Sequence, residues 1–122
     1  ALELMPDIAD LYYNIGVLYQ GRGEFSKAIE EYIKAVELNP NIKDAHYNIG
    51  IIYLKNGLLE RSLKNLEAEI KLRPEFSEAH YAVGMVYEKM GNMQKAKQAF
   101  DTAFKLAPGF YTGIDNNHPH QK

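Results

Sequence analysis

The side chains of this sequence that could do chemistry are few and poorly placed for it. No cysteine is present, so the chain offers neither a thiolate nucleophile nor a thiolate metal site. His118 and His120 form a short His-x-His pair, which binds a divalent metal only weakly without further ligands. The serines lie in no nucleophile motif, and the chain has no glycine-rich phosphate loop. We therefore expect no catalytic residues, no cofactor and no metal site.

Overall composition argues against two further classes of function. The chain has 122 residues, and 14 lysines and arginines against 16 aspartates and glutamates leave a formal net charge of −2. Without a basic excess, we expect no nucleic-acid partner. No apolar run reaches the roughly 18 residues that a membrane span needs, so we expect no span. No secretory signal opens the chain, which makes a cytoplasmic location the default expectation.

The most regular feature of the sequence is a period of 34 residues. Gly16, Gly50 and Gly84 each lie within a stretch whose apolar residues have helical spacing. Glycine in a helix interior costs roughly 1 kcal/mol relative to alanine. Three such glycines at one phase indicate that a paired helix passes too close to leave room for a side chain. The same period relates Tyr19, Tyr53 and Tyr87, then Gly23, Gly57 and Gly91, then Pro40, Pro74 and Pro108.

Each period contains two amphipathic stretches separated by a short turn. In the first period, Leu11, Ile15 and Leu18 share one helical face. A second stretch follows Gly23 and ends before Pro40, because proline disfavours helix in the residue before it. The pattern predicts helices over residues 9–22, 25–39, 43–56, 59–73, 77–90 and 93–107.

The order of residue types within each period resembles the tetratricopeptide repeat family. The family pattern is aromatic-x-x-Leu-Gly-x-x-Tyr, then Ala-x-x-x-Phe, then Ala, then Pro. The first period matches it with Tyr12, Ile15, Gly16, Tyr19, Ala28, Tyr32, Ala35 and Pro40. The third matches it with His80, Val83, Gly84, Tyr87, Ala96, Phe100, Ala103 and Pro108. The resemblance implies an all-α, right-handed superhelical solenoid of antiparallel helix pairs with a concave inner surface.

The resemblance also divides the chain. Residues 1–6 match residues 35–40, so we interpret them as the end of a truncated upstream repeat in a longer array. Repeats are then expected at 9–42, 43–76 and 77–110, followed by a polar tail at 111–122.

The second repeat departs from the family pattern, with Ser62, Leu66 and Glu69 in place of small, aromatic and small residues. A buried carboxylate without a partner is costly. We therefore expect the helix to shift or the Glu69 side chain to reach the edge; the alternative is a polar contact with a tyrosine or histidine of the third repeat. His46 and His80 occupy the aromatic position and are expected to be packing residues.

In the family, the first helix of each repeat lines the groove. The residues that the register places there are Asp10, Tyr13, Asn14, Val17, Asp44, Tyr47, Asn48, Ile51, Leu54, Glu78, Tyr81, Met85 and Glu88. The acidic residues also suit first helical turns, where they offset the helix dipole. The apolar ones, Val17, Ile51, Leu54 and Met85, are either covered by helix packing or form an apolar groove floor.

One subclass of the family grips a C-terminal carboxylate with lysine and arginine. The matching positions here are Tyr13, Val17, Asn48, Glu78 and Ala82; only Asn48 fits that pattern, and none of them is a cation. We therefore expect a protein or peptide partner that is apolar or basic rather than acidic.

Two functions remain open on these grounds. The first is a non-catalytic protein-interaction scaffold that binds a peptide or helix in the concave groove. The alternative is a structural scaffold that self-associates through the array ends or by placing the tail of one chain in the groove of another.

Overall fold

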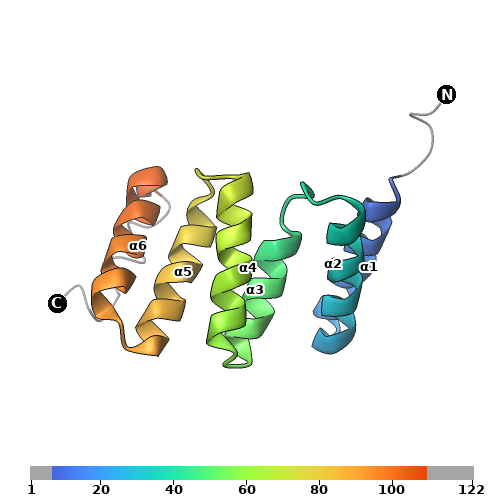
Figure 1. Cartoon of the computed structure of the whole chain (residues 1–122), viewed down its shortest axis with the longest axis horizontal. Helices are drawn as coiled ribbons and strands as arrows, with labels where there is room; N and C mark the ends of the chain where they lie inside the picture. The colour runs from blue at the N-terminus through green and yellow to red at the C-terminus, as the bar shows by residue number, and fades with distance from the viewer. Residues whose placement is uncertain (1–6, 110–122) are drawn as a thin grey trace.

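Three helical hairpins stand side by side in chain order (Figure 1). The computed structural model describes residues 7–109; the predictions for residues 1–6, for the tail and for the His118–His120 pair lie outside the described residues. Helices α1 (Ile8–Gly21) and α2 (Phe25–Leu38) form the first hairpin, α3 (Ala45–Lys55) and α4 (Leu59–Leu72) the second, and α5 (Ser77–Met90) and α6 (Met93–Leu106) the third. No strand occurs between residues 7 and 109, and the predicted all-α fold class is confirmed.

The periodic glycines lie where the two helices of a hairpin touch. A Cβ atom added to Gly50 would come 2.8 Å from Leu66 Cγ and 3.2 Å from the Ser62 carbonyl oxygen. The first distance is too short for a real Cβ contact, and the second is tighter than ordinary van der Waals contact. The predicted close approach of the paired helix is therefore confirmed. The equivalent distances are 2.7 Å from Gly16 to the Tyr32 ring and 2.5 Å from Gly84 to the Phe100 ring.

Neighbouring hairpins pack through the second helix of one repeat and the first helix of the next. Helix α2 contacts α3, and α4 contacts α5. On α3, Ala45, Ile49 and Ile52 are buried together with Ala28 and Tyr32 of α2. The apolar stripes of α3 and α5 are thus covered by the preceding repeat. None of the helices in the described part of the chain has the length and hydrophobicity to cross a membrane.

Ser62 and Leu66 fit the second repeat without distorting it. Both are fully buried. The Ser62 hydroxyl donates a hydrogen bond of 2.7 Å to the Gly50 carbonyl oxygen, which satisfies the polar group where the family pattern has alanine. Leu66 fills the space beside Gly50 that the Tyr32 and Phe100 rings fill in the other hairpins.

Glu69 caps the start of α3. Its side chain is 0% exposed, so the expectation that it reaches the edge is wrong. Its Oε2 accepts a hydrogen bond of 2.9 Å from the Asp44 amide, and its Oε1 accepts one of 3.1 Å from the Tyr47 amide. Arg73 lies 3.1 Å from the same carboxylate. The alternative of a polar contact is correct in kind, but the partners are the α3 backbone and an arginine, not side chains of the third repeat.

The same contacts explain why α3 begins at Ala45, two residues later than predicted. Asp44 has a left-handed backbone with φ of 77°, and its own side chain makes no capping hydrogen bond. An aspartate tolerates this conformation better than most residues do. Because Glu69 supplies the missing acceptor, the amides at the start of α3 are satisfied from another helix.

The two histidines at the aromatic position lie in polar contacts. His46 Nδ1 lies 3.1 Å from Asn65 Oδ1, and His80 Nε2 lies 2.9 Å from the Pro74 carbonyl oxygen. Among residues 7–109, no group of three or more metal-ligating side chains is found.

Candidate functional site

The first helix of each repeat carries a half-buried tyrosine at the same register position. These are Tyr13 on α1, Tyr47 on α3 and Tyr81 on α5, and we call the surface around them the tyrosine face. A second aromatic ring fixes each of them. The ring centroids lie 5.5 Å apart for Tyr13 and Tyr32, and 5.0 Å apart for Tyr47 and Phe76 and for Tyr81 and Phe100.

A hydrogen bond across the first two repeats ties two of the predicted groove residues together. The Asn48 side-chain amide donates to the Tyr13 hydroxyl oxygen at 3.1 Å. Next to this pair, the Tyr32 hydroxyl donates to Gln20 Oε1. Burial raises the pKa of Tyr32 to about 12. Burial and the Asp44 carboxylate raise the pKa of Tyr13 as well, so both hydroxyls remain protonated near neutral pH.

Asp44, one of the predicted acidic groove residues, is paired with a cation. The Asp44 carboxylate forms an ion pair with Arg73, and the Arg73 guanidinium lies 3.8 Å from the centroid of the Phe76 ring. Burial lowers the pKa of Arg73, but hydrogen bonds and the charges of Asp44 and Glu69 outweigh it and raise that pKa overall. The negative charge of Asp44 is therefore compensated.

The other predicted acidic residues are Asp10, Glu78 and Glu88. Asp10 and Glu78 are exposed, and the Ser77 hydroxyl donates to Glu78 Oε1 at 3.1 Å. Glu88 is half-buried. Burial, and then the Glu88 charge, raise the pKa of Tyr81, which places that carboxylate near the third tyrosine.

The four predicted apolar groove residues separate into three environments. Val17 is 42% exposed, whereas Leu54 is 7% exposed and belongs to the core around Leu66. Ile51 and Met85 are partly buried and pack against that same core. Leu54 thus supports the face from beneath and cannot meet a ligand directly. Asn14, the remaining predicted residue, is exposed on α1.

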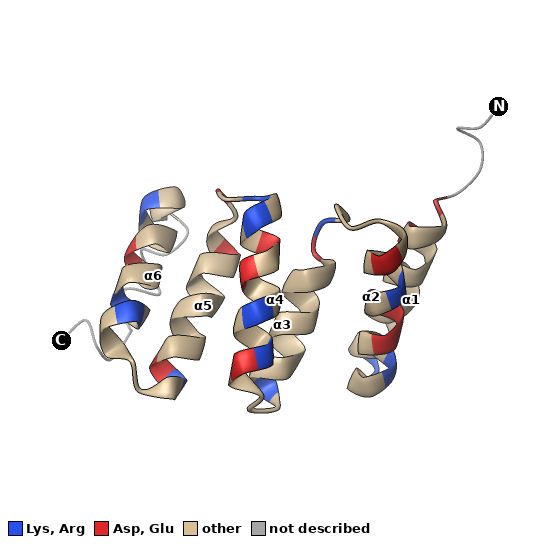
Figure 2. Cartoon of the chain, in the orientation of Figure 1, with Lys and Arg blue, Asp and Glu red and all other residues tan. Residues whose placement is uncertain are grey.

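Charge is distributed unevenly among the helices. Figure 2 shows lysine, arginine, aspartate and glutamate gathered on α2, α4 and α6, whereas α3 and α5 carry few charges. Helix α3 has a single charged residue, Lys55, in its last turn. The helices that carry the tyrosine face are therefore the less charged ones.

Arg73 and Phe76 belong to the face although the repeat pattern does not point to them. The sequence does contain a signal for Arg73, because it lies four residues after Glu69 on the same helix, and side chains at that spacing meet. Phe76 has no equally specific signal. Its ring supports Tyr47 because Leu66 replaces the aromatic residue that supports Tyr13 and Tyr81 in the other hairpins.

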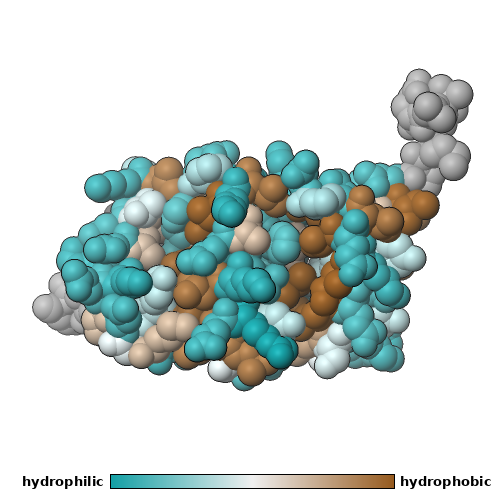
Figure 3. Space-filling model, in the orientation of Figure 1, coloured by the Kyte–Doolittle hydropathy of each residue, from teal (hydrophilic) through white to brown (hydrophobic). Residues whose placement is uncertain are grey.

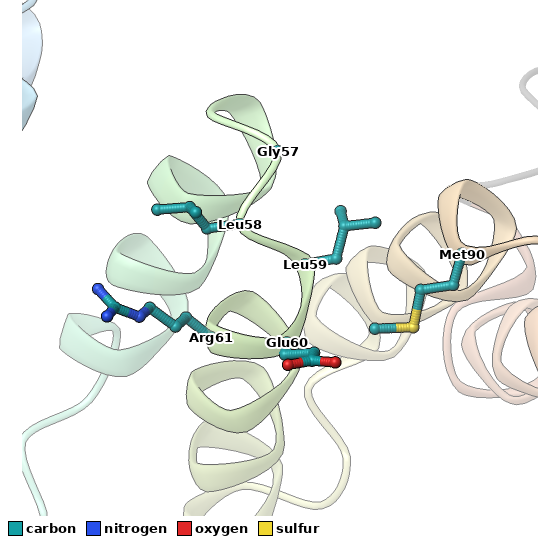
Figure 4. Close-up of a pocket in the computed structure, with 6 residues that line it drawn as sticks. All are labelled: Gly57, Leu58, Leu59, Glu60, Arg61 and Met90. Atoms are coloured by element: carbon teal, nitrogen blue, oxygen red, sulfur yellow. The ribbon is translucent and has the colours of Figure 1, made fainter.

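A pocket of about 410 Å³ lies outside the tyrosine face, where the α3–α4 turn approaches the end of α5. Leu59 from the start of α4 and Met90 from the end of α5 lie on its two sides (Figure 4). Leu58, Glu60 and Arg61 complete its rim. None of the predicted groove residues lines it.

Helical hairpins that repeat at a fixed period, close through glycine contacts within each hairpin and stack on one another define a class of α-helical repeat proteins. Family models agree with this class. A TPR repeat model matches residues 21–57, and two tetratricopeptide repeat models match residues 43–76 and 77–110. The chain belongs to the tetratricopeptide repeat family.

Several solved structures are similar. A crystal structure of MamA protein is 28% identical with a TM-score of 0.77, and the match covers 80% of this chain and 54% of that one. YrrB, described as a TPR protein with an unusual peptide-binding site, is 28% identical with a TM-score of 0.77, covering 86% of this chain and 54% of its own. The chain therefore spans about half the length of these two proteins.

A third structure shows the shared fold alone. The first TPR of Spaghetti (RPAP3), bound to the HSP90 peptide SRMEEVD, is 18% identical with a TM-score of 0.79, covering 83% of this chain and 80% of that one. A comparison with curated protein sequences found no match.

Proposed function

We propose that this chain is a non-catalytic protein-interaction scaffold whose tyrosine face binds an apolar or basic segment of a partner protein. Membership of the tetratricopeptide repeat family supports the scaffold role. The similar protein YrrB is described by its peptide-binding site, which supports a peptide as the ligand.

The observation that carries the proposal is the row of three tyrosines held by aromatic neighbours. A tyrosine offers a flat apolar body and a polar tip at a low cost in side-chain entropy. Because each ring already rests on a second ring, a ligand would not have to order it. A row of such rings, one per repeat, suits a ligand that is itself extended along the array.

Polar groups beside the tyrosines suit the backbone of such a segment. Asn48 is half-buried and donates to Tyr13, and its side chain also forms a hydrogen bond with Tyr32, so its carbonyl oxygen is the group that a ligand amide would meet. Val17 supplies exposed apolar surface one turn after Tyr13. Together they provide a mixed surface that accepts both main-chain hydrogen bonds and an apolar side chain.

Charge selects the class of ligand. Asp10, Glu78 and Glu88 lie near the face, and the one arginine in this region, Arg73, is already paired with Asp44 and Glu69. An acidic peptide would meet repulsion without a compensating cation, whereas a basic one would be attracted at low salt. The proposed ligand therefore combines apolar and basic residues.

The test uses three synthetic 15-residue peptides that share one leucine spacing and carry lysine, glutamine or glutamate at the other positions. Fluorescence anisotropy should rank their affinities for the chain in that order. Tyr13→Ala should weaken the lysine peptide by about tenfold or more, since buried aromatic anchors contribute about 1.4 kcal/mol or more. Val17→Arg should weaken it further, by both charge and shape.

Tyr12→Ala is the matched control. Tyr12 precedes Tyr13 and packs against the same core, but its ring faces Lys34 at 5.4 Å. Circular dichroism should show equal helicity for both alanine variants. No binding of any peptide at 1 mM, or equal affinity for Tyr13→Ala and Tyr12→Ala, would contradict the proposal.

The alternative of self-assembly predicts a different result. Light scattering over a concentration series would show a growing mass. A peptide that binds the groove would lower that mass if the tail of one chain occupies the groove of another, and would leave it unchanged if the array ends associate. A monomer at every concentration would contradict that alternative.

A further inference from the structure

A polar pocket lies in the crease between the two helices of the second hairpin. Its volume is about 360 Å³, and none of the predicted groove residues lines it. We call it the α3–α4 pocket. In the orientation of Figure 3, hydrophilic surface covers the middle of the molecule, where Figure 1 places α4. Helix α3 contributes His46 and Tyr53 to the lining, and α4 contributes Arg61, Lys64, Asn65 and Ala68.

Two cations of the α3–α4 pocket are not neutralised by a carboxylate. Arg61 and Lys64 are exposed and form no ion pair with any of residues 7–109. Glu60 and Glu67 lie within one turn of Lys64 on α4, but neither lines the pocket. The Arg61 guanidinium lies 5.9 Å from the centroid of the Tyr53 ring, which holds it toward α3. The pocket therefore carries positive charge that is free to meet an anion.

A histidine and an asparagine are oriented beside these cations. The Asn65 amide donates to the Arg61 carbonyl oxygen at 3.0 Å, so the acceptor that meets His46 Nδ1 at 3.1 Å is Asn65 Oδ1. This contact places the imidazole hydrogen on Nδ1. It leaves Nε2 as the ring nitrogen that donates to an anion once His46 is protonated.

The first repeat has carboxylates at the equivalent positions. Glu30 and Glu31 stand at the register positions of Lys64 and Asn65. Lys34 forms an ion pair with Glu31 at 3.6 Å, so it is neutralised within its own helix. Two carboxylates at these positions would repel an anion.

The third repeat keeps one of the two cations. A smaller pocket of about 300 Å³ lies in its crease. Lys95, the register equivalent of Arg61, lies 5.5 Å from the centroid of the Tyr87 ring. Gln98 stands in place of Lys64. Among the three described hairpins, the second thus has the most positive pocket.

We propose that the α3–α4 pocket binds a phosphate monoester on a side chain of a partner protein, such as a phosphorylated serine. Arg61 and Lys64 contact the phosphoryl oxygens from α4, and His46 contacts them from α3. This site is separate from the tyrosine face and goes beyond the proposed function. The choice of a protein as the source of the phosphate rests on the proposed scaffold role, whereas the choice of the chemical group does not.

The charge of the pocket selects this group. A phosphate monoester carries a charge of about −1.5 to −2 near neutral pH and has three acceptor oxygens. It therefore matches two cations, whereas a carboxylate would leave one of them without a partner. Arginine and lysine are also established binders of phosphoryl oxygens. An extended polyanion such as a nucleic acid or an anionic membrane fits less well, because the chain has a net charge of −2 and has Glu60 and Glu67 beside the pocket.

The test uses short peptides of glycine, alanine and asparagine with phosphoserine, serine or glutamate at the centre. These peptides offer the tyrosine face neither leucine nor lysine. Fluorescence anisotropy should give the phosphoserine peptide an affinity for the chain at least about tenfold higher than that of the other two, because charge-assisted hydrogen bonds to a dianion are the stronger ones. In a nuclear magnetic resonance titration, the amide signals of His46, Arg61 and Lys64 should move first.

Two double variants with the same change of charge separate the pocket from the overall field of the protein. Arg61→Gln with Lys64→Gln should lower the affinity for the phosphoserine peptide by at least about tenfold. Lys27→Gln with Lys34→Gln removes two cations that are already paired with glutamates, and it should lower the affinity by less than about twofold. Circular dichroism should show the same helicity for both. Tyr13→Ala should leave this affinity unchanged, which distinguishes failure of this site from failure of the tyrosine face.

Three results would overturn the proposal. The first is equal affinity of the phosphoserine peptide and either of the other two peptides. The second is an equal loss of affinity in the two double variants, which would mean that only the net charge matters. The third comes from free O-phosphoserine as a competitor: displacement of the peptide at the peptide's own dissociation constant would identify a small phosphorylated molecule, and not a protein, as the ligand.

Discussion

For the replacement of Glu69 by alanine, the structure and the family pattern predict opposite changes in stability. The pattern has alanine at this position, and the equivalent Ala35 and Ala103 are fully buried. Replacing a buried glutamate by alanine, a better helix former, would on that basis stabilise the chain. The contacts of Glu69 predict the opposite.

The magnitude follows from what Glu69→Ala leaves behind. The Asp44 and Tyr47 amides at the start of α3 would lose their acceptor, and a lost helix cap costs about 1 kcal/mol. Arg73, with a side chain 20% exposed, would lose one of its two carboxylates. Removing one partner of a buried pair costs about 3–5 kcal/mol, but Asp44 remains bound to Arg73, so we take the low end of that range.

We therefore expect Glu69→Ala to lower the free energy of unfolding by about 4 kcal/mol in total. For a chain of 122 residues, that corresponds to a fall in melting temperature of about 15 °C. Glu69→Gln keeps an acceptor oxygen but loses the charge, and it should cost about half as much.

Urea denaturation followed by circular dichroism measures the loss. Because repeat proteins can unfold in parts, amide exchange in α3 provides the local measurement, and the amides of Asp44 and Tyr47 should lose protection first. Glu67→Ala, at an exposed position two residues away on the same helix, is the control and should change stability by less than about 0.5 kcal/mol. A Glu69→Ala protein as stable as the parent, or more stable, would refute the capping role.

Three further outcomes follow from the packing. Gly50→Ala should destabilise by about 1–3 kcal/mol in urea unfolding, since its Cβ would lie 2.8 Å from Leu66; Gly21→Ala, with no atom within 4 Å, should be neutral or stabilising by up to about 1 kcal/mol. Below pH 10 the raised pKa of Tyr32, about 12, leaves stability unchanged; from pH 10 to 12 the folded state retains a proton that the unfolded state releases, so stability should fall by roughly 3 kcal/mol. Tyr32→Phe should remove that part of the loss in a pH series of urea melts. Arg73→Lys should cost about 1 kcal/mol in the same assay, because lysine keeps the charge but not the planar fork that bridges two carboxylates.

The repetitive part of this structure follows from the sequence, and the polar part of the second repeat does not. The period and the glycines predict six helices and their pairing, since packing at Gly16, Gly50 and Gly84 depends on residue size alone. The start of α3 was missed because it depends on Glu69, which is 25 residues from Asp44 in the chain. No helix-start rule that uses neighbouring residues contains that contact.

The candidate site shows the same division. Register places Tyr13, Tyr47 and Tyr81 on equivalent positions, but it cannot say that Leu54 is buried or that Asp44 is paired. Both outcomes depend on how the second and third repeats meet. Whether these residues bind a ligand stays a prediction.

The departures of the second repeat connect its stability to the tyrosine face. The Tyr47 amide donates to Glu69, and the Tyr47 ring lies against Phe76. Phe76 in turn lies under the guanidinium of Arg73, which binds Glu69. A single carboxylate thus fixes both the backbone and, through Arg73 and Phe76, the ring of the central tyrosine. In the first and third repeats, Tyr32 and Phe100 support the tyrosine ring directly. The middle of the array therefore replaces an apolar support by a buried ionic one, which ties the geometry of the proposed ligand site to the charge of Glu69.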